Sequence, residues 1–105
     1  MTMVAGPPWD GLDKIIHVRA RLGIVASLAA RGAMSFGDLK ETLEMSDGNL
    51  SVHVRTLEEA GYLEVTKEFV RRRPRTTMRL TTRGEQAFRD YVDCLESIVS
   101  PNNKR

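Results

Sequence analysis

Residues 46–65 read SDGNLSVHVRTLEEAGYLEV, and this stretch decides the fold. Its apolar residues recur at i, i+4 and i+7, so residues 47–60 are predicted to form a helix with one buried face. The buried stripe consists of Leu50, Val54 and Leu57. Ser46 stands where an N-cap residue accepts a backbone hydrogen bond, and Gly61 follows the last periodic residue. Local sequence therefore sets both ends of this helix.

A shorter helix is predicted just before it. Ser35 and Asp38 form a capping-box-like start, with Asp38 in the place usually taken by Glu. This helix runs for about two turns, to Leu43 or Glu44, and residues 44–46 link it to the next. Two helices joined through about three residues are typical of a helix-turn-helix, whose second helix enters the major groove of DNA.

The N-terminal third is predicted to hold an irregular arm and one longer helix. Pro7-Pro8 disfavours helix in residues 1–11, and Trp9 is expected to pack either on its own domain or across a subunit interface. Residues 13–31 show helical spacing, with Asp13 as cap and Gly32 as stop. The apolar positions of this helix are Ile15, Val18, Leu22, Val25 and Ala29. Residues 33–35 form a short link or a brief strand.

The C-terminal part predicts a β-hairpin and a last helix. Residues 62–67 and 76–80 alternate as strands do, and they flank a long basic tip, EFVRRRPR, which takes in Pro74 because proline cannot donate a ladder hydrogen bond. The sequence TRGE from Thr82 is a capping box that opens a helix to about Val99. The fold class is therefore mostly α with a small β-hairpin (α+β), in the order α-α-α-β-β-α.

Charge is concentrated in the hairpin. Residues 67–83 hold seven basic residues and one acidic residue, whereas the other 88 residues hold nine basic and thirteen acidic ones. A segment of +6 on a body of −4 suggests a polyanionic partner, and a solvated loop without a partner is the other interpretation.

Length and composition exclude several classes of protein. A chain of 105 residues forms one domain, and it contains no apolar run long enough to cross a membrane. The first residues do not resemble a secretory signal, and Cys94 is the single cysteine. We therefore expect a cytoplasmic protein without an internal disulfide.

Two segments together resemble a known family. DGNLSVHVRTLEEAGYLEV, followed by RPRTTMRLTTRGEQAF, is similar to winged helix-turn-helix transcriptional regulators close to the MarR and ArsR groups. The match runs from about Leu12 to Phe88. The resemblance implies a dimeric, repressor-like regulator that binds double-stranded DNA, with the third helix in the groove and the hairpin as wing. The chain then divides into an arm (1–11), a winged helix domain (12–100) with a dimerisation helix (82–99), and a frayed tail (101–105).

The face of helix 47–60 opposite the buried stripe is the expected base-reading surface. Asparagine can pair with adenine, arginine with guanine, and valine can touch a thymine methyl group. The candidates are Gly48, Asn49, Ser51, Val52 and Arg55. Gly48 either allows a close approach to a phosphate or eases the turn. His53 lies about 60° from the buried stripe, and it either contacts a phosphate or packs partly buried.

The arginines of the hairpin are the expected phosphate or minor-groove contacts. At the tip these are Arg71, Arg72, Arg73 and Arg75. Arg79 lies on the strand face opposite Met78 and Leu80, where it can reach DNA or pair with Glu64 or Glu68.

The last helix carries more apolar surface than a small domain covers, which predicts a homodimer. The expected interface residues are Trp9, Ile15, Phe88, Tyr91, Leu95 and Ile98. A monomer that folds the last helix onto the first is the alternative.

No enzyme, cofactor or metal site is predicted. The sequence has no nucleophile with a base, no Gly-rich phosphate loop and no cluster of ligands, because Cys94, His17 and His53 are scattered. A metal shared between subunits through His17 with Asp90 or Asp93 stays open. Redox sensing by Cys94 also stays open, and the alternative is that Cys94 is a buried structural thiol. An effector ligand cannot be identified.

A different class of function stays open as well. A winged helix can serve protein contacts, as in an antirepressor or a complex subunit without DNA binding. The acidic body near the motif favours this alternative, and it contains Glu41, Glu44, Glu58 and Glu59.

Overall fold

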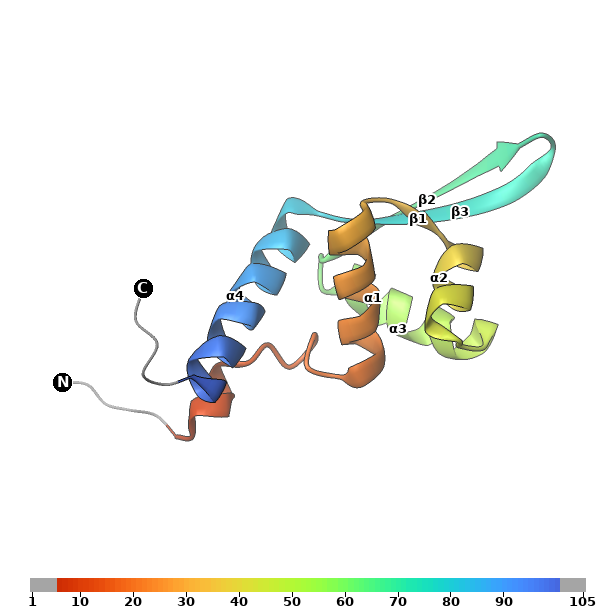
Figure 1. The fold of residues 1–105 in the computed structure, drawn as a ribbon. Coiled ribbons are helices and arrows are strands. Elements are labelled where there is room, and N and C mark those ends of the chain that lie inside the picture. Colours follow the sequence, from red (N-terminus) through yellow and green to blue (C-terminus); the bar gives the residue numbers. More distant parts are fainter. Residues whose placement is uncertain (1–5, 101–105) are drawn as a thin grey trace.

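The computed structural model describes residues 6–100, so the predicted tail and the first five residues of the arm lie outside the described residues. Four α-helices and a three-stranded antiparallel sheet follow one another, which confirms the predicted fold class (Figure 1). The elements are η1 (Pro8–Gly11), α1 (Arg19–Arg31), β1 (Met34–Ser35), α2 (Phe36–Leu43), α3 (Asp47–Glu59), β2 (Leu63–Val70), β3 (Arg73–Leu80) and α4 (Thr82–Val99).

The two central helices begin at the predicted serine caps. The Ser35 hydroxyl accepts from the Asp38 N–H at 3.1 Å, and the Ser46 hydroxyl accepts from the Asn49 N–H at 3.2 Å. Glu44 ends α2 in the left-handed conformation (φ 54°), which turns the chain sharply into α3. These local hydrogen bonds fix the helix-turn-helix geometry.

The first helix starts later than predicted. Asp13 does act as a cap, since its carboxylate accepts from the N–H groups of Ile15 and Ile16 at 2.8 and 3.1 Å. After one turn, however, Val18 is extended (φ −135°, ψ 127°), and α1 begins at Arg19. Tertiary contacts override the helical period here, because Ile16 is fully buried and Arg21 Nε donates to the freed carbonyl of Ile15 at 2.6 Å.

The hairpin tip is much shorter than predicted. Strands β2 and β3 pair as far as Val70 opposite Arg73, which leaves a two-residue turn of Arg71 and Arg72. The prediction that Pro74 lies in a loop is wrong, because Pro74 belongs to β3 opposite Phe69. In a two-residue hairpin the pair next to the closing pair exchanges no ladder bonds, so the missing proline N–H costs no hydrogen bond there.

The cap of the last helix lies one residue earlier than predicted. The Thr81 hydroxyl, rather than that of Thr82, accepts from the Gly84 N–H at 3.0 Å, and it also donates to the Gly61 carbonyl at 2.6 Å. A side chain at Gly84 would overlap the backbone carbonyl of Tyr62. Helix α4 therefore starts in direct contact with the turn that follows α3.

The core lies between the helices and the inner face of the sheet. Strand order is β1-β3-β2, and Met34 and Val65 flank the fully buried Met78 on its two sides. Of the two interpretations of residues 33–35, a short link or a brief strand, the strand is confirmed at Met34–Ser35. The predicted stripe of α3 is buried as expected, against Ile24, Val25 and Leu28 of α1.

The Tyr62 hydroxyl donates to the second oxygen of the Asp13 carboxylate and ties the N-terminal turn to the end of α3. Burial, together with this bond, raises the pKa of Tyr62 to about 12, from the ordinary value of 10.0. Its folded pKa lies above the unfolded one, so the contribution to stability is complete below pH 10 and is lost as pH rises through about 12.

We predict that Tyr62→Phe lowers the free energy of unfolding by about 1 kcal/mol at pH 8, the usual worth of such a hydrogen bond. The difference from wild type should shrink between pH 10 and 12, because only the wild type can ionise this phenol. Urea unfolding at a series of pH values measures both. A constant difference across that range would show that the Asp13–Tyr62 bond does not set the pH dependence.

Candidate nucleic-acid interface

One face of α3 is exposed to solvent. Gly48, Ser51, Val52 and Arg55 are exposed on the side opposite the buried stripe. Val52 is 62% exposed although it is apolar. A polar surface with one exposed methyl-bearing residue suits the edges of base pairs in a major groove.

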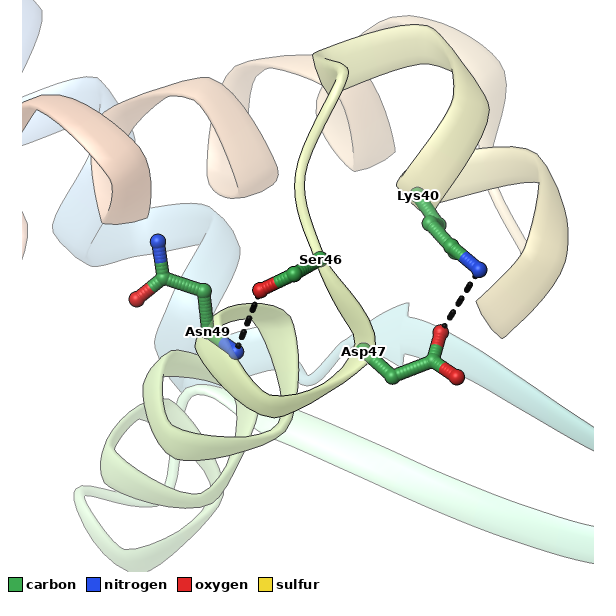
Figure 2. A network of polar contacts seen from close by, with 4 residues as sticks. All are labelled: Lys40, Ser46, Asp47 and Asn49. Atoms are coloured by element: carbon green, nitrogen blue, oxygen red, sulfur yellow. Dashed lines mark hydrogen bonds and ion pairs between the residues drawn. The ribbon is translucent and has the colours of Figure 1, made fainter.

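The charge at the start of α3 is balanced by α2. Lys40 Nζ lies 2.9 Å from Asp47 Oδ1, so this lysine offsets the carboxylate that would otherwise repel a phosphate (Figure 2). Both side chains are largely exposed, so the pair adds little stability. The amide of Asn49 lies on the other side of the helix start (Figure 2).

Asn49 and His53 occupy the edge of α3 that faces α1. Asn49 lines a cavity of about 460 Å³ with Val18, Arg19, Ala20, Gly23, Leu43 and Met45. His53 is half-buried, and its Nδ1 lies 3.3 Å from Nη1 of Arg21. Of the two interpretations of His53, the packing one therefore has a partner in the structure, and the phosphate contact stays a prediction.

A groove of about 330 Å³ runs between α3 and the hairpin. Ser51 and Arg55 line it from α3, while Lys67 and Thr76 line it from the strands. Lys67 falls in the basic segment 67–83 but is not among the residues predicted to contact DNA. The alternation of the strand could have identified it, because Lys67 shares the inner face of the hairpin with Leu63 and Val65.

The arginines of the hairpin divide between its tip and its outer face. Arg71 and Arg72 form the turn itself, with φ of 53° and 68°. Arg73, Arg75 and Arg79 alternate along the outer face of β3, where Glu68 and Glu64 stand directly opposite the last two. The tip therefore carries two cations without a facing acid, whereas Arg79 lies near the base beside one.

Helix α4 has one buried and one exposed apolar side. Tyr91 is buried, its hydroxyl lies 2.7 Å from His17 Nδ1, and burial raises its pKa. Tyr91 thus has almost no surface left for a partner subunit. Ile15, Phe88 and Ile98 are half-buried against the core, while Trp9 and Leu95 of the predicted interface are exposed together with Val92 and Val99.

No helix within residues 6–100 is long and apolar enough to span a membrane. In the same range no group of three or more His, Cys, Asp or Glu residues is placed to hold a metal ion.

The fold and this surface define a class of protein. A helix-turn-helix followed by an antiparallel hairpin whose base flanks the second helix is a winged helix domain of the DNA-binding type. The family model described as "Winged helix DNA-binding domain" matches residues 20–99. The chain therefore belongs to the winged helix DNA-binding domain family, whose members are transcriptional regulators and generally not enzymes.

Individual relatives agree with this assignment. An uncharacterised protein of Methanocaldococcus jannaschii is 37% identical over 79 residues, which cover 75% of this chain and 86% of that protein. The solved structure of a transcriptional regulator homologue from Pyrococcus horikoshii is 31% identical with a TM-score of 0.76, over 86% of this chain and 89% of that one. The YusO protein of Bacillus subtilis shares the fold at 17% identity and a TM-score of 0.74, over 90% of this chain and 66% of that one.

Gly48 has no structural reason to be glycine. An added methyl group would meet nothing within 4 Å, and the backbone there is not left-handed. Gly37 holds the same place in α2, second in the helix after a serine cap, and is equally unobstructed.

We predict that Gly48→Ala and Gly37→Ala each stabilise the fold by up to about 1 kcal/mol, because alanine is the better helix former. Only the change at Gly48, on the proposed base-reading face, should weaken binding to duplex DNA. Thermal unfolding and fluorescence anisotropy measure the two effects. Equal affinity in both variants would show that α3 does not approach DNA closely at this position.

Proposed function

We propose that the protein is a dimeric transcriptional repressor that binds a specific double-stranded DNA sequence. Helix α3 lies in the major groove, and the wing lies along the backbone or in the adjacent minor groove. The residues proposed to contact DNA are Gly48, Asn49, Ser51, Val52, His53, Arg55, Arg71, Arg72, Arg73, Arg75 and Arg79, together with Lys67.

One observation carries this proposal. The exposed side of α3 and the inner face of the hairpin line the same groove, in which Arg55 and Lys67 lie on opposite walls and Glu58 lies on the wall formed by α3. A base-reading helix beside a hairpin with Lys67 on its inner face and two arginines at its tip can engage base edges and phosphates at the same time. Base contacts would give specificity, and phosphate contacts would give most of the affinity.

The exposed side of α4 supports the dimer. Trp9, Val92, Leu95 and Val99 form an apolar surface on α4 and the adjoining η1, and a second copy of the chain would cover it symmetrically. In the proposed dimer two copies of α3 would lie about 34 Å apart, one turn of DNA, on a pseudo-palindromic site. A dimer bound in this way would repress by occupying promoter DNA.

The wing tip gives the sharpest test, because its turn is strained. Both arginines hold left-handed backbone conformations that Asn-Gly adopts readily in a two-residue hairpin. Arg71→Asn with Arg72→Gly should therefore raise the melting temperature by a few degrees, while the slope of log Kd against log salt falls by about two per protomer. Anisotropy titrations on one duplex between 50 and 300 mM salt measure the slope.

A matched variant controls for the position of the charge. Arg89→Ala removes one exposed cation from α4 and should leave the slope unchanged. A wing variant that is more stable and binds DNA with the wild-type slope would exclude the wing from the interface. Wild-type protein that shows no salt-sensitive duplex binding and co-purifies with a protein partner would favour the protein-contact alternative.

The dimer is tested separately. Leu95→Glu places a charge in the middle of the apolar surface and should shift the protein to a monomer in sedimentation velocity, because an unpaired buried charge is costly. Thr82→Glu, on the exposed first turn of α4, should leave the assembly unchanged. A Leu95→Glu protein that still sediments as a dimer would place the interface elsewhere.

A further inference from the structure

The wing carries an exposed aromatic side chain that has no role in the proposed contacts between arginines and phosphates. Phe69 is 77% exposed, the largest exposed fraction among the large apolar residues of the described chain. It lies in β2 directly opposite Pro74, and Val70 beside it is exposed as well. The end of the wing is thus apolar as well as cationic.

Strand parity fixes which way Phe69 faces. It shares the inner face of the hairpin with Leu63 and Val65, which pack in the core, and with Lys67, which lines the groove beside α3. The hairpin projects beyond the helices at this point (Figure 1). Phe69 therefore continues the surface that α3 presents, one step further out than Lys67.

The charges around Phe69 select the kind of partner. Arg71 and Arg72 follow it at the tip, and Lys67 precedes it on the same face. An apolar ring between cations matches a surface that has apolar walls and anionic rims. The minor groove of duplex DNA has this character, with deoxyribose walls between two rows of phosphates, and apolar residues are known to enter it.

We propose that Phe69, backed by Pro74, inserts into the minor groove and contacts deoxyribose and base edges there, while Arg71 and Arg72 hold the phosphate rims. This inference rests on the proposed function, because it assumes that the wing meets duplex DNA. It assigns to Phe69 a contribution to affinity that does not depend on salt, in contrast to the contribution of the arginines.

The test compares Phe69→Thr with wild type on one duplex over a series of salt concentrations. Threonine keeps the strand preference of the position and removes the ring. We expect Kd to rise about tenfold at every salt concentration with the slope unchanged, so that the two log–log lines run parallel. Phe69→Leu should recover part of the affinity. Thr82→Ala, on the exposed first turn of α4 outside both proposed surfaces, should change nothing.

Each outcome has a distinct meaning. Wild-type affinity in Phe69→Thr would overturn this inference and leave the proposed function intact, whereas absence of duplex binding by the wild type would overturn both. A melting temperature that falls together with affinity, and is restored with it by Phe69→Leu, would assign the ring to hairpin stability instead. Loss of binding to phosphatidylserine vesicles, with duplex binding unchanged, would make the tip a membrane contact.

Discussion

The pairing of β1 with β3 is the constraint on which the rest of the structure depends. Met34 and Ser35 pair with Met78 and Thr77, and Ser35 is at the same time the cap of α2. One residue therefore belongs both to the sheet and to the start of the helix-turn-helix. Because Met78 is buried between β1 and β2, the hairpin cannot shift its register without exposing the core. The wing is held in a fixed relation to α3 although most of it extends into solvent.

Local signals predicted the parts of the fold that local hydrogen bonds define. The helices after Ser35 and Ser46 begin where the sequence places them, and the buried stripe of α3 follows its period. Non-local contacts decided the rest. The break at Val18 depends on contacts with Tyr62, which follows α3, and with Arg21, which lies beyond the break. The periodicity of residues 13–31 does not indicate either contact. The length of the hairpin tip depends on how far the two strands pair. A run of arginines has no strong strand preference, so the sequence does not show how far that pairing extends.

The candidate site was predictable to a similar extent. The helical wheel separated the buried and exposed sides of α3 correctly, because the helix is regular over this range. It could not show that Asn49 and His53 face α1, since that depends on how the two helices cross. Lys67 lies inside the predicted strand 62–67 and was within reach of strand parity, but it was counted only with the basic segment 67–83. Tyr91 looked available because a single stripe on α4 does not show that half of it serves the chain's own core.

The segment between η1 and α1 connects the two functional ends of the molecule. Asp13 holds Tyr62 at the end of α3, His17 holds Tyr91 in the middle of α4, and Arg21 reaches from Ile15 to His53 on α3. In a continuous helix over residues 13–31 these three side chains, four residues apart, would lie along one face. The extended backbone at Val18 thus interrupts the helix and allows contacts that orient α3 against α4. In a symmetric dimer built on α4, the separation of the two α3 helices would follow from this orientation. The irregular segment would then set the spacing of the DNA half-sites, although none of its residues lies on the proposed DNA-binding surface.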